Sequence, residues 1–384
     1  MKTLNKEKLK STLDARFEDH LHEGRFAGAE AMVFQHGECL YHRVLGYKNA
    51  LTGEKLKGDE MYRLASMTKP ITAAATLIAV QRGWFALDDK VADYLPEYAD
   101  MEVAVIGEDG EPVTDHKARS DLKIYQMLSH CNGIMAEDEV GSALFERIPV
   151  EAYANSRTMV DYCSKQPLAF DPGTKTAYTG FASFDVVARI IEMKSGMSFG
   201  EFLDKEIFAP LGIKNITFHP TDEQWERFVT VHDRADNKTL LAYDFGRHIY
   251  EGHPLEFECA GGGIAGNMSD YAKFALMLCN NGEYNGIRIL EPEMIKEMKT
   301  ARVPDGIPGR EPNDSWGLGV RVKVHEDWLP EGTFGWSGAY GTHFWVDQEN
   351  GIVALLLRNM RFYDTHGCGQ MGIQYEKDVM SCAE

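Results

Sequence analysis

The chain has 384 residues, 44% of them hydrophobic and 26% charged, so it can bury a large core, and we exclude disorder, fibrous repeats and small disulfide-stapled scaffolds. Its 40 Lys and Arg residues against 59 Asp and Glu residues give a net charge of −19, which disfavours nucleic acid and anionic membrane surfaces as partners. The basic opening MKTLNKEKLK is followed by no apolar segment, and no later apolar run could span a bilayer, so we expect a cytoplasmic protein.

Hydrophobic periodicity predicts strands at both ends of the chain and helices between them. A polar amphipathic helix extends to about His22, and two β-prone runs, 29–34 and 39–44, form a hairpin around His36 and Gly37. Helical patterns dominate from Ser66 to about Thr300, with predicted helices at 71–83, at 122–130 behind a Ser-Asp cap, at 184–194 and at 270–282. Period-two, β-rich runs return at 317–324, 341–347 and 351–359.

This order of elements predicts an α/β (α+β) fold in a single domain spanning residues 1–384. One central antiparallel sheet would be assembled from both termini, at about 25–65 and 315–360, and flanked by helices. Residues from about 66 to 300 would supply an inserted all-helical subdomain. No long Pro/Ser linker, repeat or low-complexity tract divides the chain.

The cysteine and histidine spacing predicts neither a metal site nor a disulfide framework, and no cofactor motif is found. The cysteines are odd in number and include no Cys-x-x-Cys pair, so buried thiols are expected; they are Cys39, Cys131, Cys163, Cys259, Cys279, Cys368 and Cys382. His20 and His22 are two residues apart, so on a helix they face different sides, and no third ligand lies at a usual spacing.

Ser66 and Lys69 form a Ser-x-x-Lys motif, which is the first candidate for chemistry. The spacing places the hydroxyl and the amine one helical turn apart on the same face, within reach for proton transfer. Ser66 would then sit at the N-terminus of the 71–83 helix. Free backbone N–H groups and the partial positive charge of that end can stabilise an oxyanion formed beside the nucleophile.

Two other serines match catalytic patterns by chance. Ser120 and Lys123 repeat the Ser-x-x-Lys spacing, but they precede the 122–130 helix, so we interpret Ser120 as a helix start signal. Ser198 lies in Gly-Met-Ser-Phe-Gly, which fits the nucleophile elbow of α/β-hydrolases. That elbow requires a preceding strand, whereas helical patterns flank Ser198 on both sides, so we predict a helix cap and keep the elbow as an alternative.

Two further motifs accompany Ser66 in the sequence. Tyr178 follows the Pro172-Gly173 turn, and a tyrosine hydroxyl can relay a proton between nucleophile, amine and leaving group. Trp336, Ser337 and Gly338 open the late β-rich segment.

With these motifs the chain resembles the serine β-lactamase and penicillin-binding-protein family, in particular its class C and esterase-like branch. The resemblance extends from about residue 10 to residue 360, in stretches that follow the family's order: RLASMTKPITAAATLIAVQRG, LKIYQMLSHCNGI, DPGTKTAYTGFASFDVVARIIE, CAGGGIAGNMSDYAKFALML and GWSGAYGTHFWVD.

The resemblance implies a catalytic set and an oxyanion hole. Ser66 would be the nucleophile, Lys69 its proton partner and Tyr178 the Tyr of the Tyr-x-Asn motif. Residues 336–338 would be the counterpart of the Lys-Thr-Gly motif. The backbone N–H groups of Ser66 and Ala339 would bind the oxyanion.

Two departures from the family pattern bear on the substrate. Gly180 stands where the family has Asn, so the amide that would hold an amide substrate is missing. Trp336 stands where the family has Lys, so the cation that would meet a substrate carboxylate is missing, and an apolar wall replaces it. A charge-assisted hydrogen bond is worth about 1.5–3 kcal/mol, so carboxylate-bearing substrates should bind roughly tenfold or more weakly.

Three functional hypotheses follow for a small-molecule ester or amide substrate. The departures favour a carboxylesterase or acyl transferase that acts through a Ser66 acyl-enzyme, because ester leaving groups need less help than amides. A β-lactamase or D-amino-acid peptidase is the second hypothesis, disfavoured by Gly180 and Trp336. A non-catalytic member that binds ligands in the same cleft is the third, prompted by the missing Asn.

Overall fold

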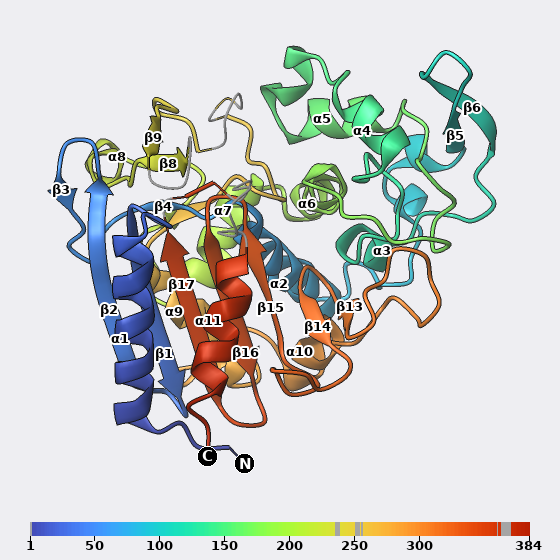
Figure 1. Cartoon of the computed structure of the whole chain (residues 1–384). Helices are drawn as coiled ribbons and strands as arrows, with labels where there is room; N and C mark the ends of the chain where they lie inside the picture. The colour runs from blue at the N-terminus through green and yellow to red at the C-terminus, as the bar shows by residue number, and fades with distance from the viewer. Residues whose placement is uncertain (1, 235–238, 250–253, 255, 359, 362–369) are drawn as a thin grey trace.

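An eight-stranded antiparallel sheet lies at the centre of the computed structural model, which describes residues 2–234, 239–249, 254, 256–358, 360–361 and 370–384 (Figure 1). The strands in spatial order are β13 (Asp314–Trp316), β14 (Arg321–Lys323), β15 (Phe334–Gly338), β16 (Thr342–Asp347), β17 (Ile352–Arg358), β1 (Gly28–Gln35), β2 (Glu38–Asn49) and β3 (Glu54–Lys55). β17 pairs with β1, with Met32 opposite Leu355. The prediction of one sheet assembled from both termini is confirmed.

Helices cover both faces of this sheet. α1 (Lys6–His22) and α11 (Met371–Met380) cover one face, and α2 (Thr68–Gln81) and α9 (Met268–Cys279) pack on the other (Figure 1). Alternate residues of β17 join the two cores: Ile352, Ala354 and Leu356 face α1 and α11, whereas Val353, Leu355 and Leu357 face α2 and α9. Burial on both faces explains why the β17 sequence is apolar throughout.

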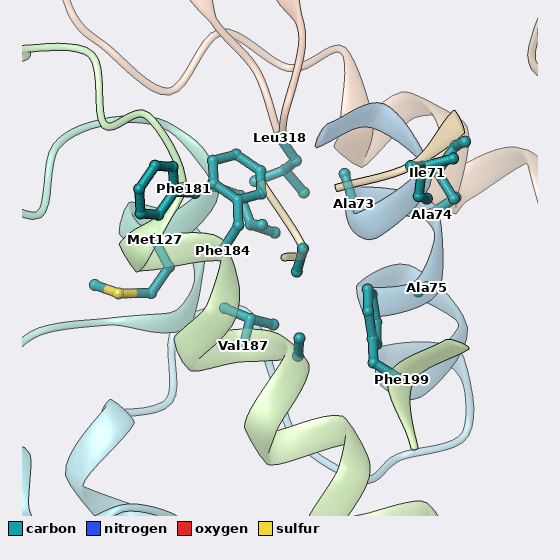
Figure 2. Close-up of a cluster of buried hydrophobic side chains, with 14 of the residues drawn as sticks. Ile71, Ala73, Ala74, Ala75, Met127, Phe181, Phe184, Val187, Phe199 and Leu318 are labelled. Atoms are coloured by element: carbon teal, nitrogen blue, oxygen red, sulfur yellow. The ribbon is translucent and has the colours of Figure 1, made fainter. Parts of the chain in front are cut away.

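The region between the two halves of the sheet is mainly helical. It contains α3 (Ile124–Leu128), α4 (Glu139–Phe145), α5 (Ser156–Cys163), α6 (Ala182–Ser195), α7 (Phe199–Leu203), α8 (Asp222–Glu226) and α10 (Pro292–Met298) besides α2 and α9. Figure 2 shows apolar side chains between α2 and α6, where the small Ala73 lies on the side of α2 that faces Phe184, and Ala74 lies beside Ile71 on the far side. This packing fixes α2, and with it the residues that begin the helix.

Short sheets also occur in this region, which the all-helical prediction did not include. They are β5 (Glu102–Ile106) with β6 (Pro112–Lys117), β8 (Val231–Arg234) with β9 (Leu240–Tyr243), β11 (Glu283–Tyr284) with β12 (Ile287–Arg288), and the three-stranded β4 (Tyr62–Arg63), β10 (Ala265–Gly266) and β7 (Ile216–Thr217). The Asp109-Gly110 turn is a hairpin signal for β5 and β6. Most of the others have only two residues per strand, too few for a periodic pattern.

Two local predictions were wrong. The helix predicted from 122 begins at Ile124, and Ser120 does not cap it, because its hydroxyl donates to the Pro172 carbonyl at 2.8 Å. The single strand predicted at 317–324 is instead a turn followed by β14, because Gly319 has a φ of +67° and a Cβ there would lie 2.6 Å from the Lys69 carbonyl oxygen. Close packing on α2 therefore overrides the period-two pattern.

The described cysteines are all free thiols. Cys131, Cys163, Cys259 and Cys382 are buried, as expected, whereas Cys39 is exposed and Cys279 is partly exposed. Cys368 lies outside the described residues. Within the part of the chain that the structure describes, no helix is both long and apolar enough to cross a membrane.

His20, on α1, should make the fold labile to acid. Burial, followed by the charge of Arg25, lowers the pKa of His20 from its ordinary 6.5 to about 4. The unfolded chain therefore binds more protons between these two values, so stability falls as the pH drops from about 6.5 towards 4, by about 3 kcal/mol for this residue. We expect His20→Phe to lose less stability than wild type between pH 7.5 and 4, measured as the urea midpoint. Equal losses in both proteins would contradict the assignment.

Candidate active site

Ser66 lies in a 3₁₀ turn, Ala65–Met67, that leads directly into α2. Residues 60–79 are all buried apart from Ser66, which is partly exposed. Ala65 has a φ of +46°, an uncommon conformation for a residue with a side chain, and it is packed in a small apolar cluster with Val231 and Tyr340. The fold therefore presents one hydroxyl within an otherwise buried segment.

Lys69 follows one turn later and is completely buried. Its Nζ atom donates to Ser66 Oγ at 3.1 Å, to the Gly261 carbonyl oxygen at 2.8 Å and to the Gly180 carbonyl oxygen. These acceptors are one hydroxyl and two backbone carbonyls. An ammonium group has three donors, so all of them are used.

Tyr178 is the second side chain in contact with Ser66. Its hydroxyl donates to Ser66 Oγ at 2.7 Å and accepts the indole N–H of Trp336 at 3.3 Å. The Tyr178 ring lies 5.5 Å from the Trp336 ring and 5.8 Å from the Trp316 ring, centroid to centroid. Trp336 therefore contributes a hydrogen-bond donor in addition to the apolar wall that its sequence position indicates.

The end of β15 lies directly against the Ser66 turn. A Cβ on Gly338 would meet both the Leu64 carbonyl oxygen and Thr342 Oγ1 at 2.2 Å, so only glycine allows this approach. Ala339 follows at once and is partly exposed. Among the described residues, no acceptor is found for the backbone N–H of Ser66 or of Ala339. Both donors are thus free for a ligand.

Asp185, on α6, secures the loop that holds Lys69. It is fully buried, its Oδ1 accepts the Ala260 N–H at 2.7 Å, and Thr72 Oγ1 donates to the Ala260 carbonyl at 2.6 Å. Burial raises the pKa of Asp185 well above its ordinary value. The next residue, Gly261, supplies the carbonyl for Lys69, and a Cβ on it would lie 2.3 Å from Phe181 Cα. The loop is therefore tied to both α2 and α6.

Comparison with known proteins identifies the family of the chain. The family model named Beta-lactamase matches residues 13–366. The chain belongs to the Beta-lactamase family. Protein MT1414 of Mycobacterium tuberculosis, described as uncharacterized, is 29% identical over 87% of this chain and 86% of its own length. Esterase EstB of Burkholderia gladioli is 27% identical over 95% of this chain and 94% of its own. The solved structure of EstCE1, a hydrolase with promiscuous acyltransferase activity, shares the fold with a TM-score of 0.77 at 20% identity, covering 98% of both chains.

In this Beta-lactamase family member, the residues predicted from separate motifs come together around Ser66. Lys69 and Tyr178 contact it directly, Gly180 contacts Lys69 through its carbonyl, and Trp336 contacts Tyr178. Ser337 differs, because its hydroxyl is engaged with His343 Nδ1 at 2.8 Å.

Ser198 lies in a separate place and lacks the partner that a nucleophile needs. It is the N-cap of α7, as predicted, and it lines a cavity of about 320 Å³. Its hydroxyl donates to Glu258 at 3.2 Å, and His219 binds the same carboxylate oxygen at 2.7 Å. The carboxylate therefore lies between serine and histidine, whereas a triad needs the histidine in the middle. This order argues against the α/β-hydrolase alternative.

Three residues near Ser66 belong to no side-chain motif that predicts a role for them. Gly261 acts through its carbonyl, and its only sequence signal is the glycine run at 261–263. His130 and Trp316 pack on the Tyr178 ring from distant segments, with no shared spacing that could reveal it. In the described part of the chain, no group of three or more His, Cys, Asp or Glu side chains could hold a metal ion.

Proposed function

We propose that the protein is a serine ester hydrolase that acts through a Ser66 acyl-enzyme, as a carboxylesterase or acyl transferase on small esters. The observation that carries this proposal is the hydroxyl of Ser66, which lies 3.1 Å from the Lys69 amine and 2.7 Å from the Tyr178 hydroxyl. A serine with two proton-transfer partners in place is the arrangement of an activated nucleophile. It also favours a catalytic role over a purely ligand-binding one.

Lys69 and Tyr178 can share the movement of the Ser66 proton. A neutral Lys69 amine keeps two N–H donors for the Gly180 and Gly261 carbonyls and turns its lone pair to the serine hydroxyl. After the proton transfer, the ammonium keeps all three contacts. Both protonation states therefore fit the same position, and little rearrangement is needed during acylation.

The reaction then proceeds in two steps. Ser66 Oγ attacks the ester carbonyl carbon, and the N–H groups of Ser66 and Ala339 stabilise the charge on the tetrahedral oxygen. The alcohol leaves with the proton that Ser66 gave up, returned through Tyr178 or Lys69. Water, or a second alcohol in an acyl transfer, attacks the acyl-enzyme and frees the serine.

Ester substrates suit the two departures at positions 180 and 336. Gly180 offers no side-chain amide, and Trp336 uses its N–H on Tyr178 rather than on a substrate carboxylate. The names of similar proteins, among them the esterase of Burkholderia gladioli, support the same substrate class.

Covalent labelling tests this proposal. A fluorophosphonate should add one adduct by intact mass, and peptide mapping should place it on Ser66, with no adduct on Ser66→Ala. An adduct on Ser198, or none on the folded wild-type protein, would contradict it.

Restoring the family amide at position 180 should widen the substrate range. A Cβ on Gly180 would meet nothing within 4 Å, so the backbone at this position has room for the start of an asparagine side chain. We expect Gly180→Asn to raise nitrocefin turnover roughly tenfold through one added hydrogen bond, while ester turnover stays within about threefold. Gly196→Asn is the control, because a Cβ there also meets nothing within 4 Å, and asparagine tolerates the positive φ of +71° at this end of α6 better than most residues. A gain in the control, or none in Gly180→Asn, would count against this account of substrate choice.

A further inference from the structure

His130 is a fully buried histidine that the proposed mechanism does not use. It follows α3, and its φ of +58° turns the chain sharply at this point. The ring lies 4.6 Å from the Tyr178 ring and 4.2 Å from the Trp316 ring, centroid to centroid. A titratable side chain packed directly beneath the tyrosine of the site calls for a physical explanation.

The hydrogen bonds of His130 converge on the segment that carries Tyr178. Its carbonyl oxygen accepts the Ala177 N–H and the Thr176 hydroxyl, each at 3.1 Å. Its ring Nδ1 accepts the backbone N–H of Thr179 at 3.0 Å. Thr179 is itself buried, with 1% of its surface exposed, so this N–H has no access to water. Loss of the ring acceptor would leave a buried donor unsatisfied.

The bond to Thr179 secures both neighbours of that residue at once. Tyr178, on one side, donates to Ser66 Oγ, and Gly180, on the other, accepts from Lys69 Nζ through its carbonyl. One side-chain acceptor therefore anchors the short backbone segment from which both groups reach the nucleophile and its lysine.

The same bond keeps His130 neutral. Because Nδ1 accepts a backbone N–H, the ring proton must lie on Nε2, which has no hydrogen-bond partner among the described residues. A second proton on Nδ1 would face the Thr179 N–H and break that contact. Burial, followed by the charge of Lys69, lowers the pKa of His130 well below its ordinary value. The acceptor is thus available throughout the neutral range.

We propose that His130 is a positioning residue of the active site, whose neutral Nδ1 fixes the Thr179 amide and thereby aligns Tyr178 and the Gly180 carbonyl with Ser66 and Lys69. This inference rests on the proposed Ser66 mechanism. It assigns His130 no proton transfer: the ring acts only through the backbone it holds. A misplacement of catalytic groups by about 1 Å can cost as much as 100-fold in rate.

Two substitutions distinguish the role of the Nδ1 acceptor of His130 from the role of its ring shape. His130→Phe keeps a flat ring of similar size but has no acceptor. In His130→Asn the Oδ1 atom occupies the place of Nδ1, and asparagine tolerates a positive φ better than most residues. We expect kcat on a small p-nitrophenyl ester to fall 10- to 100-fold in His130→Phe with KM within about threefold, and to stay within about threefold in His130→Asn.

A matched control and a pH profile complete the experiment. His20→Phe replaces another buried, neutral histidine, on α1, and should keep wild-type kcat. The acid limb of kcat/KM against pH should stay in place in His130→Asn, because His130 does not titrate there. An unchanged kcat in folded His130→Phe, an equal loss in His130→Asn, or a lost acid limb in His130→Asn would each overturn the proposal.

Ser66→Ala on the same ester separates this inference from the proposed function. Retained activity in Ser66→Ala would refute the Ser66 mechanism itself. An inactive Ser66→Ala together with a fully active His130→Phe would refute only the positioning role.

Discussion

Replacing Ser66 with alanine should lower the hydrolysis of a small p-nitrophenyl ester by about 10³-fold or more. Among the described residues, Ser66 Oγ is the one atom to which both the Lys69 amine and the Tyr178 hydroxyl are hydrogen-bonded, so the change leaves neither group with a hydroxyl to activate. Loss of a nucleophile typically costs this much or more in enzymes that form an acyl-enzyme. The measurement is kcat and KM from initial rates, with circular dichroism to confirm that the variant is folded.

Ser198→Ala is the matched control for this loss. It removes a serine hydroxyl from a catalytic-looking motif of the same chain, and we expect its rate to stay within about twofold of wild type. A large loss in Ser198→Ala, with Ser66→Ala still active, would move the chemistry to the cavity beside Glu258 and His219.

Replacing Lys69 with methionine should lower kcat by about 10²- to 10⁴-fold, the range that a positioned general base contributes. Methionine fills the same buried volume without the amine, and it leaves the Gly180 and Gly261 carbonyls without their donor. Pre-steady-state kinetics with a p-nitrophenyl ester should show a slower acylation burst. The thermal midpoint should fall, because the Gly180 and Gly261 carbonyls lose their donor, so circular dichroism at the assay temperature is needed to confirm that the variant is folded.

Lys123→Met provides the control for Lys69. Lys123 ends the second Ser-x-x-Lys of the chain, and its amine reaches Asp88 rather than a serine hydroxyl. We expect no effect on kcat. Full activity in Lys69→Met together with an inactive Tyr178→Phe would assign the base role to Tyr178 alone.

Much of the architecture could be predicted from local hydrophobic patterns in the sequence. The continuous apolar run of β17 and the hairpin of β1 and β2 predict strands at both ends of the chain. In the structure these two groups of strands meet where β1 pairs with β17. The helix around Lys69 follows from the periodicity of 71–83. The strand predicted at 317–324 failed because Gly319 must turn against the Lys69 backbone, a contact between segments about 250 residues apart. Contacts between such distant segments produce no periodic pattern in the sequence.

The candidate site, too, was predictable from the sequence only in part. The three-residue spacing from Ser66 to Lys69 corresponds to about one helical turn, so the sequence alone could place the hydroxyl and the amine together. Tyr178 and Trp336 were named by their motifs, but only the fold supplies the hydrogen bond between them.

Ser66 shows most directly what the sequence determined and what only the tertiary structure decided. Sequence by itself identified a serine one turn before a lysine, among companion motifs in a recurring order, because helical spacing and motif order are local properties of the chain. Tertiary structure alone decided that the lysine is held by the Gly180 and Gly261 carbonyls, that His130 lies beneath Tyr178, and that Ser198 faces a carboxylate rather than a histidine. These contacts use backbone atoms or join distant segments, so long-range packing, rather than residue type, creates them.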